Sequence, residues 1–181
     1  MSRPLIVVAL PEEAAHFDSD LPILFTGAGK VNAVMAVTRS LASAPELPSE
    51  IINLGTAGAL RAGLTGTHEI GLVLQHDFDS DSLKALTGRA FGEPLSLAGE
   101  GLVLATGDVF VSDPSLREAL AKRAHLVDME AYAVAAAASA FGVPVRVIKH
   151  VSDEADSSAL MSWTSTVDEA SRALAAWLAA S

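Results

Sequence analysis

Short, uninterrupted runs of Val, Ile and Leu recur along this chain, and they constrain its fold more than any other feature. An apolar run that does not alternate with polar residues is typical of a strand covered on both faces, as in a parallel sheet. The expected strands are LIVVAL (5–10), ILF (23–25), IINL (51–54), EIGLVLQ (69–75), GLVLA (101–105) and VRVIKHV (145–151). These runs favour a sheet that is buried inside the protein.

Helical segments lie between and after the apolar runs. We expect helices over residues 30–43, 114–123, 130–141 and 167–180. Asp113 followed by Pro114 is typical of a helix start, because Asp caps free N–H groups and Pro fits the first turn. Residues 80–100 show only a weak pattern, and we expect a loop there. Alternating strands and helices predict an α/β fold with a mostly parallel or mixed central sheet flanked by helices, as one domain over residues 1–181.

Composition excludes several classes of function. The net charge of −10 opposes nucleic acid and anionic membranes as partners, because phosphate binding needs clustered Lys and Arg. The chain has no cysteine, which excludes disulfides and cysteine-zinc sites and is consistent with a cytoplasmic protein. Its first apolar run is too short for a signal peptide, and no stretch approaches the length of a membrane span. The histidines form no ligand pattern, so we expect no metal and no cofactor.

Glycine-rich or acidic segments follow most of the expected strands. They are PEE (11–13), TGAG (26–29), GTAG (55–58), GDVF (107–110), DME (128–130) and SD (152–153). In an open α/β sheet, ligands bind beyond the carboxyl ends of the strands. The clustering of glycines and acids at these positions therefore predicts a ligand site at this edge of the sheet.

Each of these segments also has a purely structural interpretation. Glu13 fits the first turn of a surface helix, and Asp128 and Glu130 fit a helix start as cap and dipole partner. TGAGK (26–30) lacks the P-loop spacing and fits a tight turn between strand and helix. Phe110 fits the core as a lone aromatic residue. The residues by themselves leave both interpretations open.

Taken in order, these motifs resemble the purine nucleoside phosphorylase superfamily, and most of all its 5′-methylthioadenosine/S-adenosylhomocysteine nucleosidases. The resemblance runs nearly from end to end through ALPEEA, TGAGKVNA, INLGTAGAL, QHDFD, ATGDVFV, VDMEAYAVA and GVPVRVIKHVSDEAD. The most specific part is VDMEA followed about twenty residues later by SDEAD. The resemblance implies an enzyme that hydrolyses the N-glycosidic bond of an adenine-type nucleoside.

The resemblance also implies a role for each site residue. Asp153 would be the general acid that protonates the purine at N7, and Glu13 would position and deprotonate the attacking water. Glu130 would hold the ribose hydroxyls. The other implied substrate-binding residues are Met129 against the sugar, Thr56 near the water, Phe110 stacked on the base, Val111 at the base edge, Ser152 beside Asp153, and Lys149 where an arginine is common.

The reaction itself requires this set of groups. Breaking an N-glycosidic bond builds positive charge on the sugar, as in glycoside hydrolysis, and the departing base needs a proton from an acid. A second carboxylate must activate water, a third must hold the sugar, and an aromatic face must hold the base. Asp153, Glu13, Glu130 and Phe110 supply these four groups.

Departures from the family pattern leave other functions open. The chain lacks a hairpin's length between Phe17 and Thr26 and most of a helix between Gly88 and Gly101, and both regions commonly shape the pocket and the subunit interface. We expect a homodimer, with the 5′ substituent of the nucleoside undetermined. The alternatives are a phosphate-dependent purine nucleoside phosphorylase, a futalosine hydrolase and a non-catalytic nucleoside-binding protein.

Overall fold

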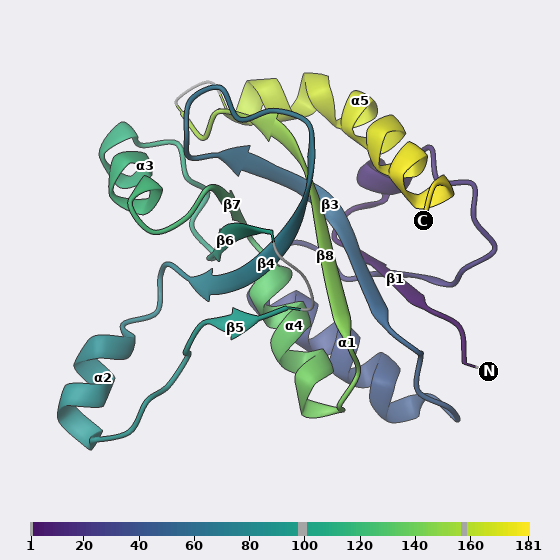
Figure 1. Ribbon diagram of the computed structural model, residues 1–181, viewed down its shortest axis with the longest axis horizontal. Coiled ribbons are helices and arrows are strands. Elements are labelled where there is room, and N and C mark those ends of the chain that lie inside the picture. Colours follow the sequence, from purple (N-terminus) through teal and green to yellow (C-terminus); the bar gives the residue numbers. More distant parts are fainter. Residues whose placement is uncertain (1, 98–100, 157–158) are drawn as a thin grey trace.

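An eight-stranded mixed sheet forms the centre of the protein (Figure 1). The computed structural model describes residues 2–97, 101–156 and 159–181. The strands are β1 (Leu5–Val8), β2 (Ile23–Phe25), β3 (Ile51–Ala59), β4 (Thr67–Gln75), β5 (Leu95–Ser96), β6 (Leu102–Thr106), β7 (Leu126–Asp128) and β8 (Val145–Asp153). Their order is β2-β1-β3-β7-β6-β4-β5, and β8 pairs with both β3 and β4.

Strand β8 closes part of this sheet into a ring. β3 bonds to β7, β7 to β6, β6 to β4, β4 to β8, and β8 back to β3. The β1–β2, β1–β3, β3–β8, β4–β6 and β6–β7 pairs are parallel, whereas β3–β7, β4–β5 and β4–β8 are antiparallel. The prediction of an α/β fold around a mostly parallel or mixed sheet is confirmed.

Helices cover both faces of the open part of the sheet (Figure 1). The helices are the 3-10 helix η1 (Pro11–Ala14) and the α-helices α1 (Lys30–Ser43), α2 (Ser80–Thr87), α3 (Pro114–Ala121), α4 (Ala131–Ala140) and α5 (Ala159–Ala179), of which α1 and α4 pack on one face and α5 on the other. Leu5 and Val7 face the cluster formed with α1 and α4, whereas Ile6 and Val8 face the cluster formed with α5. Both faces of β1 are therefore buried, which explains why its sequence is apolar at every position.

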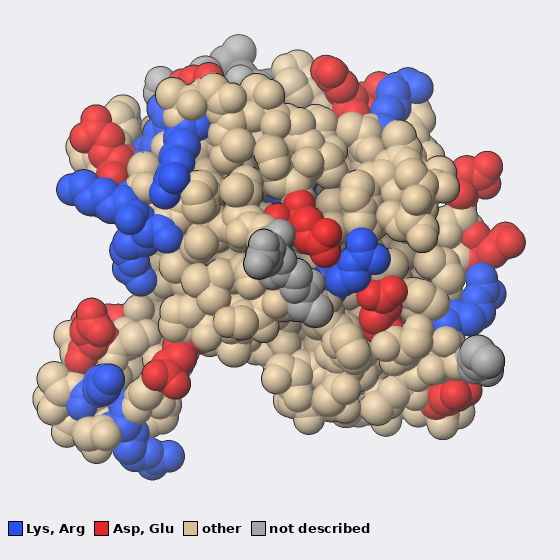
Figure 2. Space-filling view, in the orientation of Figure 1, with Lys and Arg blue, Asp and Glu red and all other residues tan. Residues whose placement is uncertain are grey.

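Several element boundaries follow the sequence closely, and others do not. The expected strand 23–25 and helix 30–43 match β2 and α1. The loop expected over 80–100 is wrong in its first part, because α2 forms there with Asp79 accepting a hydrogen bond from the Ser82 N–H; residues 98–100 lie outside the described residues. α2 and its flanking segments stand away from the body as an arm (Figure 2).

The expected strand 51–54 is too short, because β3 continues through GTAG to Ala59. Strands β5 and β7 were not expected from the sequence, and α5 begins before residue 167. None of the helices among the described residues is long and apolar enough to cross a membrane.

Candidate active site

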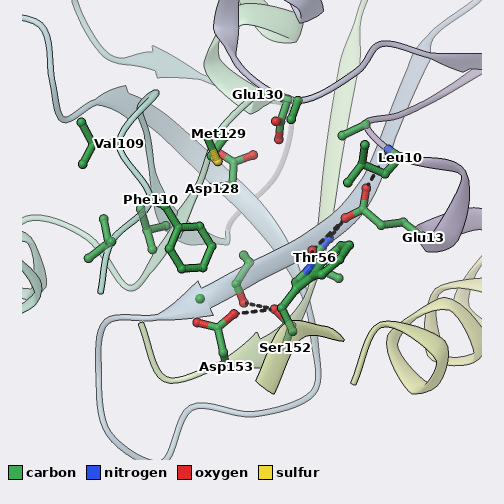
Figure 3. A pocket seen from close by; sticks show the side chains of 17 residues that line it. Leu10, Glu13, Thr56, Val109, Phe110, Asp128, Met129, Glu130, Ser152 and Asp153 are labelled. Atoms are coloured by element: carbon green, nitrogen blue, oxygen red, sulfur yellow. Dashed lines mark hydrogen bonds between the residues drawn. The ribbon is translucent and has the colours of Figure 1, made fainter. Parts of the chain in front are cut away.

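A pocket of about 230 Å³ opens where β1, β3, β7 and β8 end (Figure 3). Every predicted site residue except Lys149 lines it, namely Glu13, Thr56, Phe110, Val111, Met129, Glu130, Ser152 and Asp153. These residues come from segments far apart in the sequence. Their convergence agrees with the expectation of a ligand site at the carboxyl edge of the strands.

Glu13 is turned into the protein by η1, directly after β1. Its side chain is buried, with the residue only 4% exposed, so the interpretation as a surface helix residue is wrong. Its Oε1 accepts hydrogen bonds from the Thr56 N–H at 2.7 Å and from the Thr56 hydroxyl at 2.8 Å. Its Oε2 accepts a longer bond, 3.2 Å, from the Leu10 N–H. The carboxylate is thus fixed in the pocket wall, and Oε2 accepts fewer and longer hydrogen bonds than Oε1.

Glu130 lies at the start of α4 and joins two loops of the site. Its Oε1 accepts a hydrogen bond of 2.7 Å from the N–H of Gly29, in the TGAGK turn. Gly29 has a φ of 93°, a conformation that L side chains rarely adopt, so the turn favours glycine there. Burial raises the pKa of Glu130 to about 7, and the negative charge of Asp128 adds to this shift against the opposing charge of Lys149. The Glu130 carboxyl group therefore changes between its neutral and charged forms near neutral pH.

Lys149 lies beneath the pocket rather than in its lining. Its ammonium contacts Asp128 Oδ2 at 2.9 Å, and both side chains are almost fully buried. Burial would lower the pKa of Lys149, but the charges of Asp128, Glu130 and Glu13 outweigh it and raise the pKa. Lys149 was expected to contact substrate, but it does not line the pocket; it pairs with Asp128 and places a buried positive charge near Glu130 and Glu13.

Asp128 is the partner that the sequence did not single out for the site. The residue has its side chain near the helix start, as expected of a cap, and its Oδ2 accepts from the Ala131 N–H at 2.9 Å. Its Oδ1 also accepts from the Thr106 hydroxyl at 2.6 Å. The same carboxylate therefore binds the start of α4, as the helix-start interpretation expects, and pairs with Lys149 in the wall of the pocket.

Asp153 lies at the end of β8, opposite Glu130 across the pocket (Figure 3). Its Oδ2 accepts from the Ser152 hydroxyl at 2.7 Å, and its Oδ1 accepts from the Ala155 N–H at 2.9 Å. Ala155 reaches this position with a φ of 49°, which is uncommon for a residue other than glycine. A Cβ on Gly58 would come within 2.8 Å of Asp153 Oδ1, so the close approach of β3 requires glycine.

The loop after β6 supplies an apolar wall. Phe110 is 42% exposed and faces the pocket, so the interpretation as a core residue is wrong. Val111 beside it is buried. Asp108 ties this loop to the TGAGK turn, because its Oδ1 accepts from the Lys30 N–H at 2.7 Å. The phenyl ring therefore lies on a loop that is braced against the turn that holds Glu130.

The sequence analysis also missed lining residues, among them Leu10 and Trp163. Leu10 borders the pocket beside Glu13, and Trp163 reaches it from α5. The indole N–H of Trp163 donates to the Thr56 hydroxyl at 2.9 Å. Tryptophan is rare in this chain, which has two, and the position of Trp163 ten residues after Asp153 was the available signal.

Comparison with known families agrees with the motifs. The family model of the phosphorylase superfamily matches residues 19–181. This chain belongs to the phosphorylase superfamily. Within it, a 5′-methylthioadenosine/S-adenosylhomocysteine nucleosidase from Bacillus cereus (strain G9842) is 32% identical over 173 aligned residues, which cover 82% of this chain and 74% of the relative. The superfamily predicted from the ordered motifs is confirmed.

Solved structures of the superfamily share the fold. The 5′-methylthioadenosine/S-adenosylhomocysteine nucleosidase of Helicobacter pylori, bound to butyl-thio-DADMe-Immucillin-A, has a TM-score of 0.86 at 23% identity, covering 99% of this chain and 97% of that one. A futalosine hydrolase mutant from Helicobacter pylori strain 26695 has a TM-score of 0.86 at 21% identity, covering 98% and 97%. The fold is common to both activities and does not separate them.

Proposed function

We propose that this protein hydrolyses the N-glycosidic bond of an adenine-type nucleoside, of the 5′-methylthioadenosine or S-adenosylhomocysteine kind, and releases free base and sugar. The observation that carries this proposal is the placement of Asp153, Glu13 and Glu130 around one pocket that Phe110 borders. The nucleosidase relative at 32% identity supports it. A cytoplasmic location, consistent with the lack of cysteine, is part of the proposal.

Each carboxylate has a separate task in this reaction. Asp153 gives its proton to N7 of the base as the bond between the base and the sugar C1′ breaks, and the bonding electron pair leaves with the base. Water then attacks C1′ and gives a proton to Glu13. Within the described part of the chain, Glu13 Oε2 accepts one hydrogen bond, the 3.2 Å bond from Leu10, so it keeps a lone pair for this water. Glu130 accepts hydrogen bonds from the ribose hydroxyls.

Ionisation of Glu130 is expected to control substrate binding. Its charged form accepts hydroxyl hydrogen bonds worth on the order of 1.5–3 kcal/mol each. Because burial and Asp128 raise the pKa of Glu130 to about 7, kcat/KM should rise with pH toward and through that value. Glu130→Gln should lower kcat/KM at about pH 8 by roughly 10- to 100-fold and remove this pH dependence. Steady-state kinetics of both proteins across pH measure the effect.

Thermal stability distinguishes a role of Glu130 in binding substrate from a role in stabilising the start of α4. Folding raises the pKa of Glu130 from 4.5 to about 7, so its contribution to stability is full below pH 4.5 and is lost as pH rises through 7. Glutamine mimics the protonated form, so Glu130→Gln should not lower Tm at about pH 8. A lower Tm with unchanged kcat/KM would instead assign Glu130 to helix capping.

The nucleophile is expected to be water rather than phosphate. The pocket lining among the described residues includes Glu13, Asp128, Glu130 and Asp153 and no Lys or Arg. A phosphate charge about 4 Å from one carboxylate costs roughly 4 kcal/mol at an effective dielectric near 20. Base release should therefore proceed at full rate without phosphate and yield free sugar. Activity that requires phosphate and yields sugar 1-phosphate would establish a phosphorylase.

Hydrolysis of futalosine is the second candidate function, because a futalosine hydrolase shares the fold of this protein. Base release from 5′-methylthioadenosine, S-adenosylhomocysteine, adenosine and futalosine, compared side by side, distinguishes the two substrates. We expect the adenine nucleosides to give the higher kcat/KM. Tight binding of nucleosides with no base release would identify a non-catalytic binding protein.

A homodimer is also part of the proposal. α1 exposes an apolar stripe of Val31, Val34 and Met35, with Phe25 of β2 nearby in the chain, at 64%, 37%, 62% and 45% exposure. Val31, Val34 and Met35 share one helix face by their spacing. Met35→Glu should shift the protein to monomer in size-exclusion chromatography with light scattering. Leu86→Glu, on the projecting α2, is the matched control, and a dimer that survives Met35→Glu would exclude this interface.

A further inference from the structure

Trp163 begins a chain of hydrogen bonds that ends on Glu13. The indole Nε1–H donates to the Thr56 hydroxyl at 2.9 Å, and that hydroxyl donates to Glu13 Oε1 at 2.8 Å. The Thr56 N–H also donates to Glu13 Oε1, at 2.7 Å. Thr56 and Glu13 lie side by side in the pocket wall (Figure 3). The mechanism assigned above makes no use of the indole.

The chemistry of the three groups fixes the direction of this chain. An indole N–H only donates, an ionised carboxylate only accepts, and a hydroxyl has one proton and two lone pairs. The Thr56 hydroxyl must therefore accept from Trp163, and its single proton remains for Glu13. Without the indole, the same hydroxyl can rotate and accept a hydrogen bond from another donor in the pocket.

The direction of the chain decides which oxygen of Glu13 serves as the base. Oε1 is occupied by two short bonds from Thr56, whereas Oε2 has, among the described residues, the single 3.2 Å bond from Leu10. We propose that Trp163 is a positioning residue for Glu13, which acts through Thr56 to hold Oε1 and so present Oε2 to the attacking water. This inference rests on the proposed hydrolysis.

A second bond anchors the same end of α5. The Thr166 hydroxyl donates to the Ser152 carbonyl oxygen at 2.9 Å, next to Asp153. Trp163 and Thr166 thus join one helix to β3 and β8, the strands that carry Thr56 and Asp153. The position of the indole is therefore set by a helix that is hydrogen-bonded to two adjacent strands of the pocket wall.

The substitution Trp163→Phe tests the role of the donor, because it keeps an aromatic ring in the pocket and removes the N–H. We expect kcat for 5′-methylthioadenosine to fall about 3- to 10-fold, with KM changed less than about twofold. The matched control is Trp177→Phe, the other tryptophan, which does not line the pocket and packs partly buried against the Leu174 cluster, beside the guanidinium of Arg146. Equal kcat values for the two variants would overturn the proposal.

A double-mutant comparison shows whether the effect passes through Thr56. Trp163→Phe should lower kcat when added to Thr56→Ser, which keeps the hydroxyl, and should have no further effect when added to Thr56→Val. A structural role of the ring alone would give the same loss on both backgrounds. If Trp163→Phe lowers kcat by the same factor in the Thr56→Ser and Thr56→Val proteins, the action of Trp163 through Thr56 is contradicted.

A measurement without substrate separates this inference from the proposed function. With ¹⁵N-labelled tryptophan, Trp177→Phe assigns the two indole signals, and the Trp163 N–H should exchange slowly with solvent. Thr56→Val should shift this signal and speed its exchange, whereas Thr56→Ser should not. If the enzyme is active but Thr56→Val leaves the Trp163 signal and its exchange rate unchanged, the hydrogen-bond chain through Thr56 is overturned. The hydrolase proposal would then still stand. Wild-type protein that releases no base would overturn the hydrolase and the positioning role together.

Discussion

Asp153→Asn is expected to lower kcat for adenine release by roughly 10²- to 10⁴-fold and to leave the fold intact. The amide has no acidic proton to give to N7, so the base must depart as a poor anionic leaving group. The local structure tolerates the change, because Asn keeps an oxygen for the Ala155 N–H, and the Ser152 hydroxyl is able to accept from the new amide. Single-turnover base release and a thermal melt on one sample measure both effects.

The control for this substitution lies next in the chain. Glu154→Gln also removes one carboxylate, but Glu154 is exposed and does not line the pocket. It should keep kcat within about twofold of the wild type. A near-normal kcat for Asp153→Asn would remove Asp153 from the role of general acid and direct attention to the other acids of the pocket.

The architecture was predictable because burial leaves a direct mark on sequence. Strand β1 alternates between two helix layers, with Val7 toward α1 and α4 and Val8 toward α5, so both faces require apolar residues. Gly29 before Lys30 and Pro114 after Asp113 marked helix starts through their backbone chemistry. The acids at strand ends were then expected to converge, since parallel strands end at one edge of a sheet.

The longer strands were not predictable in the same way. β3 continues through Gly55 and Gly58, and glycine is depleted in strands. Their small size is required by neighbours that are distant in sequence: a Cβ on Gly55 would approach both Glu13 Oε1 and Lys149 Nζ to 3.2 Å. Tertiary contacts decide the conformation there, and a single sequence does not record which residues make them.

The buried ion pair of Lys149 was not predicted from the sequence for a related reason. The lysine was expected near substrate because it stands where the family commonly has an arginine, but its partner Asp128 precedes it by 21 residues and had a sufficient local explanation as a helix cap. Only the fold shows that β7 and β8 bring the two charges to 2.9 Å under the pocket. A buried ion pair has no periodicity, so pattern analysis does not detect it.

Lys149→Met is expected to destabilise the protein by about 3–5 kcal/mol at neutral pH, because removal of one partner leaves a buried charge without compensation. The Lys149 side chain is 3% exposed, and it faces Asp128 with Glu130 and Glu13 nearby. Methionine keeps most of the side-chain volume, so the loss measures charge rather than packing. Chemical denaturation gives the free energy of unfolding, and Lys122→Met, at an exposed lysine, is the control.

The pH dependence of this loss identifies its electrostatic origin. The neighbouring carboxylates raise the pKa of Lys149 above 10.5, so its stabilising contribution is fully present below that value and is lost only as pH rises through the folded-state pKa. The pKa of Glu130 is about 7, so lowering the pH from about 8 to about 5.5 neutralises one of the acids that the lysine compensates. The destabilisation by Lys149→Met should therefore be smaller at about pH 5.5 than at about pH 8.

Adding Asp128→Asn to Lys149→Met should recover part of the lost stability, because the double variant no longer buries the unpaired carboxylate. A loss that is equal at both pH values, and unchanged by Asp128→Asn, would show that Lys149 acts through packing alone.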